Sequence, residues 1–218
     1  MQNRILTRWS PAWSSAVMFL CCAGFDVGSA AATGSDTTPS STDPRRDMIA
    51  ALEAPGPAPS LGDQANVFGR LVGTWKIEYA FLSKDGTTSR SSGDFSVGWV
   101  MEGRVVQCLF TIDPSADRKE KYIGSSLNYF DAKSQTWRMV YVDPENDAVI
   151  RVTGGAAGND RIVLLTPDTD GKVNRWSFDD IRPDSFVYRD EVSHDGGKTW
   201  RLQEEDHMTR REAAAPGQ

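Results

Sequence analysis

Hydrophobic and polar residues alternate with a period of two along most of the chain between Asn66 and Arg211. In the first such run Trp75, Ile77 and Tyr79 alternate with small or polar residues. Similar runs follow at 95–99, 137–141, 176–178 and 186–192. A period of two is that of a half-buried β-strand, because successive side chains point to opposite faces. The pattern therefore predicts an all-β domain over residues 66–211.

Turn-forming residues separate these runs at the spacing of short strands. They include Lys84-Asp85-Gly86, Asp143-Pro144-Glu145-Asn146, Thr169-Asp170-Gly171 and Asp195-Gly196-Gly197. The breaks divide the domain into about ten strands with mostly short connections, which favour antiparallel neighbours. Closing such a sheet on itself removes its exposed edges. We therefore predict an antiparallel up-and-down barrel, with an open β-sandwich as the alternative.

Residues 1–30 have the pattern of a secretory signal peptide. Basic residues precede the apolar run Ala16–Phe25, and small residues around Ala30 provide a cleavage site. The run is shorter than the roughly 20 apolar residues that cross a bilayer, so we expect no stable membrane insertion after cleavage. The pattern predicts a secreted or periplasmic protein. Lipidation at Cys21 or Cys22 is a minor alternative.

The segments that flank the domain have a different composition. Residues 31–65 are rich in Ala, Ser, Thr, Pro and Asp and contain no aromatic residue, which predicts a disordered or weakly helical linker. A short helical turn is predicted at Asn66–Leu71. Residues 212–218 are again Ala-, Pro- and Gly-containing and predict a disordered tail.

Charge and cysteine content exclude several classes of function. The formal net charge is −6, and Lys and Arg do not cluster, so we expect no nucleic-acid partner. Cys108 is the one cysteine outside residues 1–30 and lies in an apolar run, which favours a buried small side chain over a nucleophile. The scattered His and Cys residues form no zinc pattern, so no metal site is predicted.

The sequence Gly73-Thr74-Trp75, after a short helical turn, resembles the opening of the calycin superfamily of lipocalins and fatty-acid-binding proteins. In that superfamily an Arg on the last strand packs across the Trp and closes the base of the barrel. Arg210 is the candidate for that role here. A cation–π stack of this kind contributes roughly 1 kcal/mol.

The whole predicted domain also resembles a group of bacterial proteins of unknown function with a lipocalin-like domain. That resemblance rests on residues 68–75, 129–131 with Trp137, 184–186, and 195–200 followed by 209–211. It implies a fold and no particular activity.

Acidic residues lie on the predicted inward side of the last two strands. Alternation places Glu204 and Asp206 inward, and Asp190 shares the face of Tyr188. The preceding turn sets Asp190 opposite Leu202, which makes it a diagonal neighbour of Glu204. Two interpretations stay open. Either the carboxyls form a polar cluster that binds a polar ligand end or acts as acid and base, or the barrel is wet or bulged there.

Haem is the one cofactor that the sequence suggests as a candidate. Barrels of the nitrobindin type also open with Gly-Thr-Trp and bind haem through a His near the last strand, where His207 lies in this sequence. Alternation turns His207 outward. We therefore expect no cofactor, with haem at His207 as the alternative.

The leading functional hypothesis is binding of a small, mostly apolar ligand of unknown identity inside the barrel. The candidate ligand-binding residues are Trp75, Trp99, Tyr188, Glu204, Asp206 and Arg210. One alternative is a calycin-like enzyme of the isomerase, hydratase or cyclase type, with Asp190, Glu204 or Tyr188 as proton carrier. Another is a structural or partner-binding envelope domain with a filled barrel. With no catalytic motif present, the sequence favours a non-enzyme.

Overall fold

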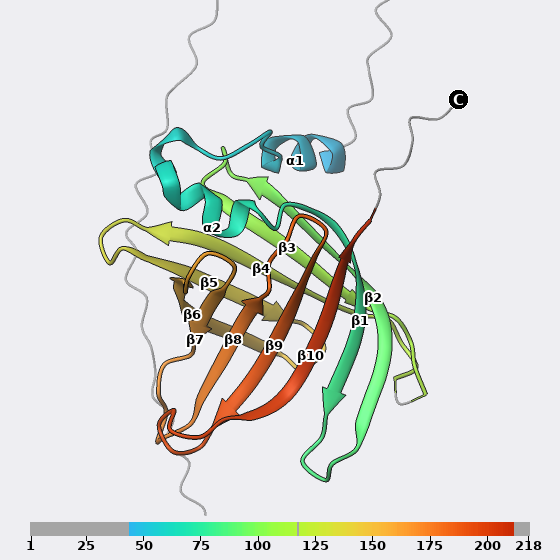
Figure 1. Ribbon diagram of the computed structural model, residues 1–218. Helices are drawn as coiled ribbons and strands as arrows, with labels where there is room; N and C mark the ends of the chain where they lie inside the picture. The colour runs from blue at the N-terminus through green and yellow to red at the C-terminus, as the bar shows by residue number, and fades with distance from the viewer. Residues whose placement is uncertain (1–43, 117, 212–218) are drawn as a thin grey trace, which may run out of the picture. The chain divides into compact units, whose positions relative to one another are not determined.

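A computed structural model of the chain describes residues 44–116 and 118–211, which fold into a ten-stranded antiparallel barrel (Figure 1). The predicted signal peptide, residues 31–43 and the predicted tail lie outside the described residues. The strands are β1 Gly73–Leu82, β2 Thr88–Val100, β3 Val105–Ile112, β4 Tyr122–Asp131, β5 Thr136–Asp143, β6 Ala148–Ala156, β7 Ile162–Leu165, β8 Val173–Asp179, β9 Ser185–Ser193 and β10 Arg201–Arg210.

The barrel is closed by the first and last strands. Each strand pairs with its neighbours in sequence, and β1 pairs with both β2 and β10. Across the closing pair Trp75 lies opposite Arg210 and Phe81 opposite Glu204. The predicted up-and-down barrel of about ten strands is confirmed, and the open sandwich is wrong because closure pairs both edge strands.

Three short helices precede β1. They are α1 Pro44–Leu52, the 3₁₀ helix η1 Pro59–Gln64, and α2 Ala65–Gly69. The α1 helix falls within the range predicted as a disordered or weakly helical linker, and the Met101 amide donates to the Leu52 carbonyl at 3.0 Å. None of the described helices has the length and hydropathy of a transmembrane span.

The α2 helix and the residues after it close one end of the barrel. Phe68 and Leu71 are fully buried. The Phe68 ring centre lies 4.8 Å from that of Trp137 and 6.0 Å from that of Phe178, so Phe68 plugs the barrel between β5 and β8. Burial of each such side chain stabilises the fold by about 1.5–3 kcal/mol. A five-residue helix has little stability of its own, so this packing holds α2 in place.

Trp75 and Arg210 close the same end. The guanidinium carbon of Arg210 lies 3.9 Å from the Trp75 ring centre, and Arg210 Nη1 donates to the Val72 carbonyl at 3.0 Å. Gly73 has φ 136°, and a Cβ at this position would lie 2.3 Å from Arg210 Nη1. The Gly-x-Trp sequence therefore has a physical basis: Gly73 leaves room for the arginine that covers Trp75.

One predicted register is wrong because β10 contains a bulge. Leu202 lies opposite Glu191, whereas Glu204 lies directly opposite Asp190. The register shifts between Leu202 and Glu204, so Gln203 is the extra residue. Asp190 is thus the direct cross-strand neighbour of Glu204, instead of facing Leu202.

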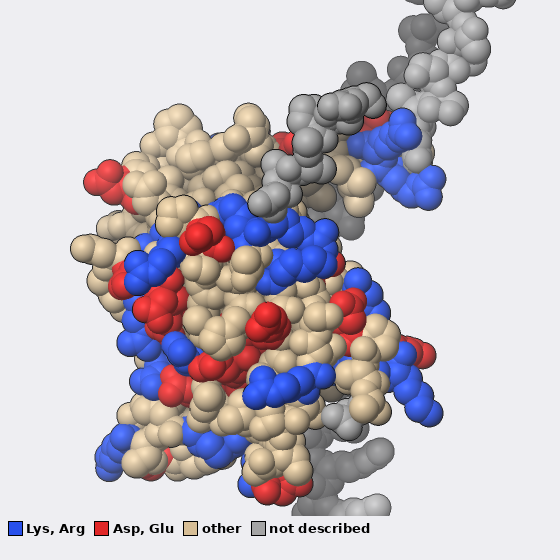
Figure 2. Space-filling model, turned by 45° about the vertical axis from the view of Figure 1, so that its right-hand side comes forward, with Lys and Arg blue, Asp and Glu red and all other residues tan. Residues whose placement is uncertain are grey.

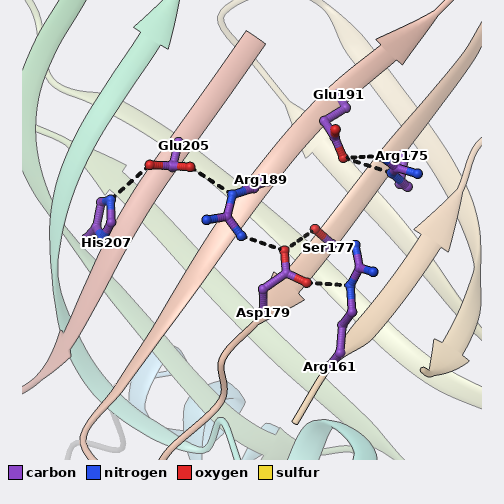
Figure 3. Close-up of polar contacts among 8 residues, drawn as sticks. All are labelled: Arg161, Arg175, Ser177, Asp179, Arg189, Glu191, Glu205 and His207. Carbon is purple, nitrogen blue, oxygen red and sulfur yellow. Dashed lines mark hydrogen bonds and ion pairs between the residues drawn. The ribbon is translucent and has the colours of Figure 1, made fainter. Parts of the chain in front are cut away.

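The outer face of β8, β9 and β10 carries a network of ion pairs (Figure 3). Asp179 accepts hydrogen bonds from Ser177 at 2.7 Å and from Arg189 at 2.9 Å. Arg189 also donates to Glu205 at 2.8 Å. On the face shown in Figure 2, basic and acidic side chains are interspersed over the surface. The outward carboxylates of this network therefore have cationic partners.

Candidate ligand-binding cavity

The barrel encloses a cavity of about 380 Å³. This volume falls in the range of small-molecule sites, which are mostly apolar with a few polar groups. The aromatic part of the lining consists of Tyr79, Phe81, Phe95, Phe110, Tyr122, Tyr141, Trp176, Phe178 and Tyr188. Aliphatic and sulfur-containing side chains add Cys108, Ile112, Met139 and Ile150. The wall is thus mostly apolar and comes from nearly every strand.

The cavity reaches the end of the barrel opposite α2. Its lining there includes Arg118 from the β3–β4 connection, Asp143 at the end of β5 and Asn146 from the β5–β6 turn. The Arg118 guanidinium carbon lies 5.0 Å from the ring centre of Tyr122, and the guanidinium pairs with Glu145. A ligand would therefore enter past a charged rim into an aromatic interior.

Two tyrosines meet just inside this rim. The hydroxyls of Tyr122 and Tyr141 form a hydrogen bond. Gly124 makes this possible, because a Cβ there would lie 2.2 Å from the Tyr141 hydroxyl. Burial raises the pKa of Tyr122 to about 12 and also raises the pKa of Tyr141. Both phenols stay protonated at neutral pH and can exchange hydrogen bonds with a ligand.

Asp190 on β9 marks the acidic wall of the cavity. Asn174 Nδ2 donates to one of its carboxyl oxygens at 3.2 Å, and Gln203 Nε2 donates to the other at 2.8 Å. The bulge in β10 brings Gln203 to this contact. Burial raises the pKa of Asp190, although both amides favour its ionised form.

Glu204 and Asp206 on β10 continue this wall deeper into the barrel. Burial raises the pKa of Glu204 well above its usual value, and the charges of Asp206 and Asp190 raise it further. Asp206 is fully buried between Tyr79 on β1 and Tyr188 on β9. Burial raises its pKa to about 8, against the opposing influence of the Glu204 carboxyl and the Ala80 amide. The two acids therefore retain protons near neutral pH.

Asp206 has no hydrogen-bond partner for either carboxyl oxygen within the described residues. Glu204 and the Ala80 amide are close enough to affect its pKa, but neither reaches hydrogen-bonding geometry. A buried polar group without a partner costs roughly 1–3 kcal/mol. Asp206 is thus a destabilising feature of the barrel.

The structure brings some of the predicted site residues together and separates others. Tyr188, Asp190 and Glu204 line the cavity, and Asp206 lies next to them. The remaining three candidates, Trp75, Trp99 and Arg210, are absent from the cavity lining. Trp75 and Arg210 form the barrel base described above.

Trp99 and His207 lie elsewhere in the barrel. A Cβ at Gly69 of α2 would lie 3.0 Å from the Trp99 ring, which places this indole against the closing helix. His207, the candidate haem ligand, is exposed, and its Nε2 lies 3.0 Å from Glu205 on the outer face (Figure 3). His207 therefore does not contribute to the cavity.

Several residues that line the cavity were not among the site residues predicted from the sequence. Tyr79, Tyr141 and Trp176 lie on the inward side of runs that the alternation had identified. The period of two could have assigned them to the interior. It could not have told a cavity wall from a packed core, because both present the same parity.

No known protein family matches the sequence, and no curated protein is significantly similar to it. Solved structures do share its fold. The structure titled "Crystal Structure of Rv2717c from M. tuberculosis" matches with a TM-score of 0.52 and 14% identity, over 72% of this chain and 99% of that one. An S-type phycobiliprotein lyase, CPES from Guillardia theta, matches with a TM-score of 0.47 and 12% identity, over 67% and 91%. The first likeness supports the fold alone, a closed antiparallel β-barrel.

Proposed function

We propose that this protein binds a small, mostly apolar molecule inside its barrel. The proposal rests on one observation, the cavity of about 380 Å³ behind an aromatic wall. A barrel filled by its own side chains would leave no such space. Transfer of an apolar ligand from water to this wall is favourable, and a barrel closed by strand pairing needs little rearrangement to accept it.

Neighbouring serines on β4 allow a matched test of this proposal. Ser126 lines the cavity, whereas Ser125 lies on the outer side of the same strand. Ser126→Phe would fill part of the cavity, and Ser125→Phe would add the same ring outside. We expect the neutral dye N-phenyl-1-naphthylamine to bind the wild type and Ser125→Phe alike, and to bind Ser126→Phe at least tenfold more weakly.

Circular dichroism and thermal melting serve as controls for the folding of both variants. Native mass spectrometry of the purified wild-type protein adds a search for a retained molecule. Equal dye binding by Ser126→Phe and the wild type would place the dye outside the barrel and contradict the proposal. Failure of the wild type to bind the dye or retain any molecule would contradict it as well.

Acid–base catalysis is a second candidate, favoured by the raised pKa values of Glu204 and Asp206. A carboxyl that titrates near neutral pH can deliver and accept a proton in one cycle. Screening with substrates of isomerases, hydratases and cyclases tests this. Any turnover should be lost in Glu204→Gln while dye binding is kept. Turnover that survives in Glu204→Gln would exclude this residue as the proton carrier.

Export is part of the proposed setting, because residues 1–30 have the pattern of a signal peptide. Expression of the full chain in a bacterial host tests it. We expect a protein outside the cytoplasm whose mass corresponds to cleavage near Ala30. Recovery of uncleaved protein from the cytoplasm alone would argue against export.

A further inference from the structure

The carboxyl groups of Asp190 and Glu204 lie on one wall of the cavity, and the buried Asp206 lies next to them. Among the described residues none of the three forms an ion pair. Glu204 lies directly opposite Asp190, and Asp206 follows Glu204 on the same face of β10. Among the residues that line the cavity, Arg118 is the basic one, and it pairs with Glu145 at the rim. The described lining therefore holds two acidic groups of this wall and no free basic group, and Arg201 on β10 donates to Gln203 at 3.2 Å.

The outer face of the same strands shows the opposite arrangement (Figure 3). Asp179 and Glu205 both pair with Arg189, and Glu191 pairs with Arg175 at 2.7 Å. The outward carboxylates Asp179, Glu191 and Glu205 thus each have an arginine partner. The inward acids lack arginine partners among the described residues. A cation carried by a ligand could therefore pair with them.

Asp206 is the fully buried member of this group of acids. Its fully buried carboxyl has two acceptor oxygens without partners, and it is flanked by Tyr79 and Tyr188, which both line the cavity. A cation beside this wall would favour the ionised form of Asp206, whose pKa burial raises to about 8.

We propose that the ligand is an amphiphilic amine whose ammonium group donates hydrogen bonds to Glu204, next to the buried Asp206. This rests on the proposed function and names the chemical class of its ligand. The apolar body of the amine would pack against the aromatic wall, where ring faces such as that of Trp176 also attract a cation. Within the described residues no three His, Cys, Asp or Glu side chains are placed to hold a metal ion, which favours an organic cation.

Protonation links binding to pH. Burial keeps protons on Glu204 and Asp206, and an ammonium group beside them would lower both pKa values. Amine binding should therefore release protons, and its affinity should rise as the pH rises toward 8. The other titratable or charged groups in the cavity lining are Tyr79, Cys108, Arg118, Tyr122, Tyr141, Asp143, Tyr188 and Asp190. The four phenols and the thiol have raised pKa values and stay neutral over this range.

Three probes with one carbon skeleton separate the chemistry of the polar end: 4-phenylbutylamine, 4-phenylbutan-1-ol and 4-phenylbutanoate. Calorimetry should give an affinity for the amine at least tenfold above that for the alcohol, with the carboxylate weakest. Titrations in two buffers of different ionisation enthalpy should show proton release with the amine and none with the alcohol.

Near-isosteric variants then locate the effect. Glu204→Gln and Asp206→Asn should each reduce the preference for amine over alcohol at least tenfold and leave the alcohol affinity unchanged. Glu78→Gln removes the same charge from an exposed position of β1 and should keep the wild-type preference. The wild-type comparison of probes stands by itself if a variant does not fold.

The results with the probes and variants distinguish the amine inference from the proposed apolar binding. Binding of amine and alcohol with equal affinity, or an unchanged preference in both cavity variants, overturns the amine inference and leaves the proposed apolar binding intact. Tightest binding of the carboxylate also overturns it, because the acids would then act as neutral donors. If none of the probes binds and the naphthylamine dye does not bind either, both proposals fail.

Discussion

Asp206 on β10 lies directly opposite Tyr79 on β1, and burial raises the pKa of both side chains. Two acidic groups thus face each other inside the barrel, and both prefer to keep their protons. Ionisation of Asp206 near pH 8 places an unpaired charge between buried phenols. The stability of the barrel should therefore depend on whether Asp206 is ionised.

Stability should fall as the pH rises from about 4 to about 8. The folded protein holds the Asp206 proton up to a pKa of about 8, whereas the unfolded chain releases it near the ordinary aspartate pKa of 3.8. The folded state therefore binds more protons in this window, which lowers the free energy of unfolding by up to about 1.4 kcal/mol per pH unit. Glu204, whose pKa is also raised, acts in the same direction.

Urea unfolding between pH 5 and pH 8 checks this dependence in the wild type and Asp206→Asn. The variant has no titratable group at this position and should show a shallower slope, by about one proton. Asp131 and Asp195, whose pKa values lie at or below about 2, are ionised throughout this window and do not blur the comparison. Identical slopes would mean that Asp206 is ionised in the folded barrel.

Removal of the arginine at the barrel base should destabilise the protein. Arg210→Ala loses the stack on Trp75 and the hydrogen bond to the Val72 carbonyl, which together contribute about 2 kcal/mol. Arg210→Lys keeps the charge but not the planar stack, so it should recover less than half of the loss. Urea denaturation measures both variants.

Arg211→Ala is the neighbouring control. Arg211 forms a surface ion pair with Asp94, and such a pair contributes less than about 1 kcal/mol. A loss from Arg211→Ala as large as that from Arg210→Ala would mean that general charge, rather than the Trp75 stack, stabilises this end.

The outer ion-pair network should be sensitive to its central carboxylate. Asp179 is nearly buried and contacts Ser177, Arg161 and Arg189. Asp179→Asn should cost about 2 kcal/mol, because two arginines lose a common partner. A double-mutant cycle with Arg189→Met should give a coupling of about 1 kcal/mol that weakens in high salt. Purely additive effects would show that the network does not stabilise the barrel.

Cys108 should be protected from thiol reagents in the folded protein. It is buried, as its apolar sequence context predicted, and burial raises the pKa of its thiol from 9.0 to about 12. The thiolate fraction then falls roughly a thousandfold, and the thiolate is the reactive form. Iodoacetamide at pH 8 should label the chain only after urea is added. Rapid labelling without urea would indicate that the cavity opens widely.

The sequence by itself determined the all-β class and the pairing of strands that are neighbours in sequence, and it favoured closure of the sheet over an open sandwich. Alternation around Trp75 and the Asp-Gly turns are local signals, and short turns force neighbours in sequence to pair. Gly73 and Arg210 could be related to Trp75 through a known resemblance. The inward parity of Tyr188 and Glu204 also followed from the period of two, since it fixes the face of each residue.

Only the tertiary structure decided the depth and pairing of these side chains. Parity does not give the position along the barrel axis, so Trp75 and Trp99 were grouped with residues that line the cavity although they lie outside its lining. The bulge at Gln203 depends on the hydrogen bonds that β1 and β9 offer to β10, and it brought Glu204 opposite Asp190. Whether the inward side chains fill the barrel depends on the packing of all ten strands together, which no local stretch of sequence encodes.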